Sequence, residues 1–129
     1  MNVLSPRIHA ALDYLSVLVL VLAPTLFGLN DVAATGAYAL AAIHLALTLL
    51  TDFPGGVMKV VPLRVHGAVE IVVGVLLVLA PLVIPAATDL GMSGRIFFIG
   101  FGAVLVVVWA ITDYVGVHTE LHDDLHTGI

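Results

Sequence analysis

The chain has no cysteine and few charged residues, and both shortages limit what it can be. Without cysteine there are no disulfides and no thiolate metal ligands. Charged residues make up 10% of the 129 positions and apolar residues 61%, whereas soluble domains average about 25% and about 45–50%. So few charges could not cover a water-soluble fold, and the lipid bilayer is the expected solvent. With only four Lys and Arg residues, the chain is not expected to bind nucleic acid.

Four long apolar segments fill most of the sequence. A helix needs roughly 20 mostly apolar residues to cross a bilayer, and residues 8–29, 32–51, 63–85 and 93–114 each reach that length. Short joints with Asn, Asp, Pro or Gly separate them, so consecutive helices should pack antiparallel. We predict a single all-α integral membrane domain over residues 1–129, a four-transmembrane-helix bundle. The first segment is long enough to span, so we expect it to be retained rather than cleaved as a signal peptide.

Lysine and arginine are unevenly distributed between the two ends of the predicted bundle. Arg7 precedes the first segment, and Lys59 and Arg64 lie in the central joint. The two hairpin turns contain only Arg95. Short loops that are rich in Lys and Arg stay in the cytoplasm. We therefore predict a multi-pass protein of a prokaryotic cell membrane (the inner membrane), with both termini on the cytoplasmic side.

The second half of the sequence repeats polar features of the first half. An Arg-x-His followed by an acid recurs at an offset of 57 residues, and a Thr-Asp pair recurs at an offset of 61. The first set of matches is Arg7, His9 and Asp13 with Arg64, His66 and Glu70. The second set is Thr51 and Asp52 with Thr112 and Asp113. Several polar matches at one offset in so apolar a chain indicate an internal duplication.

The duplication predicts two helical hairpins of similar structure. Repeat 1 covers about residues 7–56 and repeat 2 about residues 64–117, followed by a polar C-terminal tail at 118–129. Because both repeats start from the same membrane face, they should be related by a pseudo-two-fold axis along the membrane normal. Arg-x-His opens the first and third helices and Thr-Asp closes the second and fourth, so these residues should converge on the cytoplasmic side.

The converging residues include two acids at unusual positions. His9 and Asp13 are spaced i,i+4, as are His66 and Glu70, which puts each pair within side-chain reach on one helix face. Unbroken apolar sequence follows each acid. A carboxylate in such a place is costly unless it is paired or faces the bundle interior, so intramembrane acids are candidates for function.

Three interpretations of these residues remain open. Imidazole and carboxylate ligands suit zinc, iron or manganese, and the candidate metal ligands are His9, Asp13, Asp52, His66, Glu70 and Asp113. Alternatively, His9 and His66 are axial ligands of a haem, with Arg7 and Arg64 near its propionates. In the structural interpretation, the His/acid pairs only lock helix packing in a homo-oligomer or an accessory subunit of a larger membrane complex. Proton or ion transfer is a further alternative.

The other histidines, and the motifs that the sequence lacks, are weaker indicators of function. The sequence has no Gly-rich phosphate loop, nucleophile elbow or His-Glu-x-x-His motif, which favours a binding or structural role over an enzyme. His44 lies in mid-span and has Leu105 at the matching position, so it either bonds a neighbouring helix or has a separate function. The tail places His118, His122 and His126 at i, i+4 and i+8, either as a solvated acidic tail or as a divalent-metal stripe.

The repeated unit resembles the SPW-repeat membrane proteins, a family of small bacterial and archaeal proteins with paired two-helix repeats. The resemblance rests on Arg7-x-His9 with Asp13, on residues 51–55 (Thr-Asp-Phe-Pro-Gly), and on Val61-Pro62 followed by His66 and Glu70. It covers most of the chain up to about Gly116. The Ser-Pro-Trp that names the family is replaced by Ala-Pro-Thr at 23–25 and Ala-Pro-Leu at 80–82. The resemblance implies the architecture and carries no activity.

Overall fold

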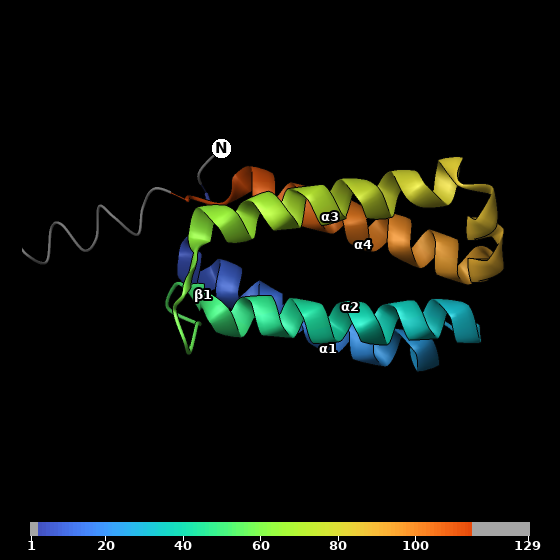
Figure 1. The fold of residues 1–129 in the computed structure, drawn as a ribbon, viewed down its shortest axis with the longest axis horizontal. Coiled ribbons are helices and arrows are strands. Elements are labelled where there is room, and N and C mark those ends of the chain that lie inside the picture. Colours follow the sequence, from blue (N-terminus) through green and yellow to red (C-terminus); the bar gives the residue numbers. More distant parts are fainter. Residues whose placement is uncertain (1–2, 115–129) are drawn as a thin grey trace, which may run out of the picture.

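The computed structural model describes residues 3–114, and these form four long helices with short connections (Figure 1). The helices are α1 (Pro6–Leu26), α2 (Asp31–Leu50), α3 (Leu63–Val83) and α4 (Gly91–Ile111). Two short strands, β1 (Thr51–Asp52) and β2 (Val61–Pro62), and a 3-10 helix, η1 (Pro85–Leu90), complete the described elements. All four helices are long and apolar enough to cross a membrane. The predicted all-α architecture, with four helices of membrane-spanning length and hydropathy, is confirmed.

The helix boundaries differ from the predicted spans by a few residues. Pro24 and Pro81 lie inside α1 and α3, and each helix ends two residues after its proline. Local chemistry explains two of the starts. Ser5 caps α1 by accepting the amide of Ile8 at 3.3 Å, with Pro6 at the first helical position. Asn30 caps α2 by accepting the amide of Ala33 at 2.9 Å. The predicted tail at 118–129, and the end of repeat 2 from residue 115, lie outside the described residues.

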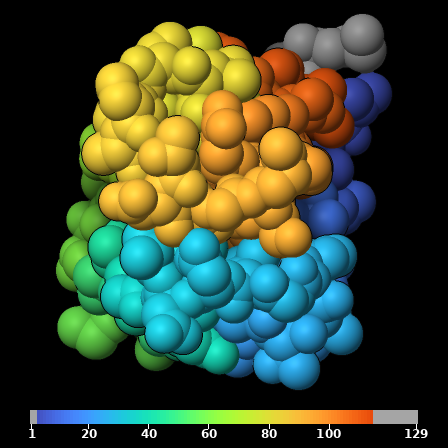
Figure 2. All heavy atoms as spheres, turned by 90° about the vertical axis from the view of Figure 1, so that its right-hand side faces the viewer, coloured from blue at the N-terminus to red at the C-terminus, as the bar shows by residue number. Residues whose placement is uncertain are grey.

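The helices pair as two antiparallel hairpins, α1 with α2 and α3 with α4 (Figure 1). The turns of both hairpins lie at one end of the molecule, where the residues of the α3–α4 turn lie next to those of the α1–α2 turn (Figure 2). Asn30 joins the two turns because its side-chain amide donates to the carbonyl of Asp89 at 2.8 Å. The opposite end, with the starts of α1 and α3 and the ends of α2 and α4, carries the polar residues singled out from the sequence.

Small residues bring the helices close together. A Cβ atom added at Gly102 of α4 would lie 2.7 Å from the carbonyl oxygen of Gly74 on α3, so the two backbones are in contact there. Ala33, Ala37 and Ala41 form the buried stripe of α2. The middle of the bundle is an apolar core whose buried members are Leu20, Ala41, Phe101 and Leu105. This core separates the polar end from the turns.

Short backbone pairings tie the chain together at the polar end. Strand β1 runs parallel to β2, with Thr51 opposite Val61. Leu4 pairs in the same parallel sense with Thr112, just beyond α4. Each pairing joins the segment that leaves one hairpin to the segment that enters the other. The ends of α2 and α4 are therefore held beside the starts of α3 and α1.

Candidate functional site: a buried histidine–carboxylate cluster

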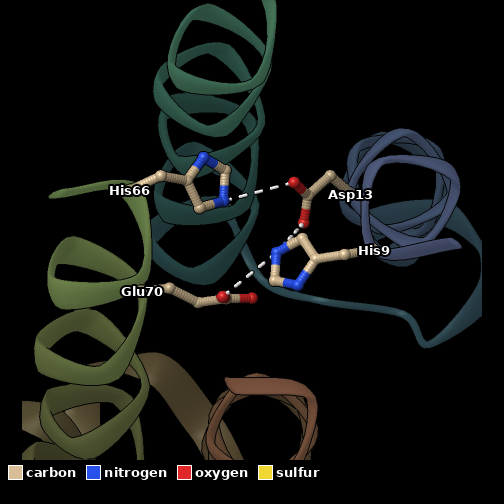
Figure 3. A group of neighbouring side chains, drawn as sticks. All are labelled: His9, Asp13, His66 and Glu70. Carbon is tan, nitrogen blue, oxygen red and sulfur yellow. Dashed lines mark ion pairs between the residues drawn. The ribbon is translucent and has the colours of Figure 1, made fainter. Parts of the chain in front are cut away.

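Four ionisable side chains meet in the interior of the polar end. His9 and Asp13 come from α1 and His66 and Glu70 from α3, and all four point toward one another (Figure 3). Each is at most 3% exposed. Each offers one ligand atom, and these atoms all lie within 4.8 Å of one another. The cluster therefore brings together residues up to 61 positions apart, from helices of different hairpins.

Both carboxylates contact a histidine of the other hairpin. Asp13 Oδ2 lies 3.2 Å from His66 Nε2, and Glu70 Oε2 lies 3.3 Å from His9 Nε2. Asp13 also contacts its own helix neighbour, with Oδ1 at 3.4 Å from His9 Nε2. The i,i+4 pairing expected from the sequence is thus present for His9 and Asp13, and contacts across the hairpins complete the cluster.

The other ring nitrogen of each histidine is held by a threonine. His9 Nδ1 lies 2.7 Å from the hydroxyl of Thr112, and His66 Nδ1 lies 2.8 Å from the hydroxyl of Thr51. These contacts also cross between the hairpins, because each histidine uses the threonine that ends a helix of the other one. Both threonines are buried, at no more than 3% exposure.

The threonine hydroxyls determine which nitrogen carries the hydrogen. Thr51 donates to the carbonyl of Leu47 and Thr112 donates to the carbonyl of Val108, each at 2.6 Å. A hydroxyl has a single hydrogen to donate, so toward the imidazole it must accept. The histidine Nδ1 is therefore the N–H donor. In the neutral imidazole, the lone pair is then on Nε2, the atom that faces the carboxylates.

A third histidine approaches the same carboxylate. His44 of α2 is 7% exposed, and its Nε2 lies 3.5 Å from Asp13 Oδ1. Among the described residues, the Nε2 atoms of all three histidines are buried without a hydrogen-bond partner, as are Asp13 Oδ2 and Glu70 Oε1. Carboxylate oxygens are acceptors, as are the Nε2 atoms of neutral His9 and His66 in the tautomer that the threonines fix, and buried acceptors without donors are costly. The cluster thus requires a positive charge at its centre, either protons or a metal ion.

Two aromatic rings cover the cluster at the end of the bundle. The ring of Phe53 is 5.6 Å from that of His66 and is almost fully buried. The ring of Tyr114 is 6.0 Å from that of His9, and its hydroxyl donates to Glu70 Oε2 at 3.4 Å. Burial and the Glu70 carboxylate both raise the pKa of the Tyr114 phenol. Tyr114 therefore stays a protonated donor, and together with Phe53 it separates the cluster from bulk water.

The remaining predicted site residues are not members of this group of four. Arg7, Arg64 and Asp52 are exposed. Asp113 is half-buried, and its backbone amide donates to the carbonyl of Leu4 at 2.9 Å. Of the six candidate metal ligands, the structure brings four together, and neither Asp52 nor Asp113 belongs to that group of four.

Backbone geometry explains why Asp52 points away. Thr51, Asp52 and Phe53 follow α2 and are buried, exposed and buried in turn. Successive side chains of an extended segment point to opposite sides. The recurring Thr-Asp pair therefore directs its threonine, not its acid, to the histidine.

Sequence reasoning gave no site role to Thr51, Thr112 or Tyr114 and left that of His44 open. The recurrence of Thr-Asp beside the recurrence of His was a usable signal for the threonines. His44 is four positions before Thr48, which is fully buried, so the two share one packed helix face. That spacing could have indicated that His44 faces the interior.

Comparisons with known proteins add nothing to this geometry, since no family model, curated protein or solved structure matches the chain. The resemblance to SPW-repeat proteins stays a prediction that rests on its motifs. The function must therefore be inferred from the cluster itself.

Proposed function

We propose that this multi-pass membrane protein binds one divalent transition-metal ion in the buried cluster of His9, Asp13, His66 and Glu70. The observation that carries the proposal is the orientation of the two imidazoles. Threonine hydroxyls accept the Nδ1–H groups, so both Nε2 lone pairs are available to a cation between two carboxylates. Metal-binding histidines typically donate their other N–H to an acceptor such as a carboxylate, a carbonyl or water, which fixes the tautomer and the ring orientation. The threonine hydroxyls take this place here.

The separations within the cluster suit a metal centre. Zinc binds imidazole nitrogen and carboxylate oxygen at about 2.1 Å, so two ligands at the tetrahedral angle lie about 3.4 Å apart. The contacts of His9 with Asp13 and Glu70, and of His66 with Asp13, are 3.2–3.4 Å. These distances are longer than a strong hydrogen bond between charged groups, at about 2.7–2.9 Å. They favour a shared cation over direct pairing.

A bare metal ion fits these contacts better than haem. In a bis-histidine haem the macrocycle lies between the two imidazoles. Here the carboxylate of Asp13 contacts both His9 and His66, at 3.4 and 3.2 Å. Arg7 and Arg64, the residues expected near haem propionates, are exposed. The donor set of two imidazoles and two carboxylates instead suits zinc, iron or manganese.

The proposal includes the arrangement in the membrane. We propose that the two hairpins are repeats of one SPW-like unit, related by a pseudo-two-fold axis, in the inner membrane of a prokaryote. The crossed contacts of His9 with Thr112 and His66 with Thr51 join matching positions and support this. Arg7, Lys59 and Arg64 are exposed at the end that holds the cluster, which supports cytoplasmic termini.

Metal analysis of the purified protein tests the proposal. The full chain is isolated in detergent without chelators and with a tag that lacks histidine. The tail histidines (His118, His122 and His126) are replaced with glutamine, so that any bound metal reports the buried cluster. We expect close to one zinc, iron or manganese ion per chain. Replacing His9 and His66 together with leucine should abolish binding.

The alternative is a structural or accessory subunit in which the cluster only locks the helices. It predicts no metal in the purified chain, even after incubation with each ion. It also predicts that the His9 and His66 variants lose thermal stability without losing any ligand. The metal site would therefore be refuted by a native chain that binds no metal and whose melting temperature does not change when metal is added.

A further inference from the structure

His44 occupies a position that the four-residue cluster does not explain. It comes from α2, a third helix, and only 7% of its surface is exposed. Its Nε2 is fully buried and has no hydrogen-bond partner among the described residues. The same atom lies 3.5 Å from Asp13 Oδ1. An unpartnered imidazole nitrogen is thus directed at the edge of the proposed metal site.

The shared oxygen of Asp13 connects His44 to that site. Asp13 Oδ1 lies 3.4 Å from His9 Nε2 and 3.5 Å from His44 Nε2. Neighbouring ligands of one metal ion lie about 3.0 Å apart at the octahedral angle and about 3.4 Å apart at the tetrahedral angle, so both distances are close to this range. The rings of His44 and His66 are also close, with centroids 6.4 Å apart. His66 Nε2 lies 3.2 Å from the other oxygen, Oδ2, so the carboxylate of Asp13 contacts all three imidazoles.

We infer that His44 is a fifth metal ligand and that the site is built for iron or manganese. The inference rests on the metal site proposed above and assigns its coordination number and its class of metal. Four protein ligands complete the tetrahedral shell typical of a structural zinc ion. Three imidazoles and two carboxylates exceed that number, and such mixed nitrogen and oxygen donors suit iron and manganese. One position of a six-coordinate ion would stay open to a small ligand.

His44 also breaks the similarity between the two halves of the chain. The matching position on α4 is Leu105, which is buried in the apolar core at 3% exposure. A device that only locked two similar hairpins together would have no need for a single extra imidazole. The asymmetry is expected if the extra ligand completes one off-axis metal ion.

The visible spectrum of bound cobalt tests the inference, because tetrahedral Co²⁺ absorbs much more strongly than five- or six-coordinate Co²⁺. The protein is the full chain with the tail histidines replaced, loaded with Co²⁺ alone. We expect the weak spectrum of high coordination for this protein and the intense tetrahedral spectrum for His44→Leu. His44→Leu should still bind zinc, while its affinity for Mn²⁺ falls by at least about tenfold, a loss that removal of even an outer partner can cause.

A second variant separates a ligand from a positioning residue. In His44→Gln, the amide can still donate a hydrogen bond to Asp13, while its carbonyl oxygen is a much weaker ligand for Co²⁺ than an imidazole nitrogen. If His44 is a ligand, His44→Gln gives the same intense spectrum as His44→Leu. If His44 only orients Asp13, His44→Gln keeps the native spectrum, and the inference is overturned.

The remaining outcomes are equally distinct. If the spectrum of His44→Leu is the same as the native spectrum, the fifth ligand is refuted while the four-residue metal site stands. A native chain that binds no cobalt, zinc, iron or manganese refutes both. Zinc binding by His44→Leu shows that the variant still folds around the cluster, so a changed cobalt spectrum reports coordination rather than unfolding.

Discussion

Replacing Thr51 with valine tests whether the threonine hydroxyls keep the histidine Nε2 atoms free to bind a metal ion. Valine keeps the shape of the side chain but removes the oxygen that accepts His66 Nδ1–H at 2.8 Å. The released imidazole can then carry its hydrogen on Nε2, which lies 3.2 Å from Asp13 Oδ2. That hydrogen must leave Nε2 before a metal ion can bind. We therefore expect the metal affinity of Thr51→Val to fall.

The expected size of the effect follows from the place of the threonine beside a ligand. Loss of a partner that orients a metal-bound histidine lowers affinity by about 10–100-fold, which corresponds to about 1.4–2.8 kcal/mol of binding free energy. Competition with a coloured chelator, on protein in lipid nanodiscs, measures the dissociation constant for zinc. Nitrogen-15 NMR of the metal-free protein should place the hydrogen of His66 on Nδ1, and on Nε2 in the variant.

Thr48→Val is the matched control for this experiment. Thr48 is as buried as Thr51, and its hydroxyl likewise donates to the carbonyl four residues earlier, that of His44, at 2.8 Å. Thr48→Val loses the same kind of hydrogen bond to a backbone carbonyl, but it removes no partner of a histidine ring nitrogen. Its zinc affinity should therefore stay at the native level. Thr112→Val should behave like Thr51→Val through His9. Native affinity in both variants would refute the argument from hydrogen position.

Two further predictions concern the packing of the bundle and its far end. Gly102→Val should destabilise the protein by about 1–3 kcal/mol, because the Cβ atom of the new side chain meets the backbone of Gly74. A Cβ atom at Gly100 meets nothing within 4 Å, so Gly100→Val should melt like the native chain in detergent. Equal melting temperatures for the two variants would contradict this packing. Asn30→Ala should lower stability by about 0.5–2 kcal/mol through the lost helix cap, and Asn30→Asp should recover most of it, because a carboxylate also caps α2. Any stability that Asn30→Asp does not recover measures the hydrogen bond to Asp89. An equal loss of stability in both variants would show that this hydrogen bond, rather than the helix cap, stabilises the turn.

Much of the architecture could be predicted from local sequence. Four apolar stretches of about 20 residues specify four helices, because a helix satisfies every backbone group inside a bilayer. The i,i+4 spacing of His9 and Asp13 specifies that they share a helix face, and α1 indeed buries both. The same holds for His66 and Glu70 on α3. These inferences need only the geometry of one helix.

Contacts between elements could not be predicted in this way. The sequence indicated Asp52 and Asp113 as ligands because acids are the obvious donors beside histidine. Whether a residue points inward just after a helix depends on how the chain leaves that helix. At Thr51 the backbone is already extended, with φ −80° and ψ 140°, so the threonine faces inward and Asp52 outward.

The sequence by itself thus determined the four spans, the polar end and the two His/acid pairs, since each depends on hydropathy or on spacing along one helix. Only the tertiary structure decided which atoms face one another. It placed His66 against Asp13 and Glu70 against His9. It also brought His44 of α2 into contact with Asp13, and the Tyr114 hydroxyl into contact with Glu70. These contacts join segments far apart in the chain, and their distances follow from the packing of one hairpin against the other. That packing brought polar residues from separate helices into a single buried cluster of histidines and carboxylates.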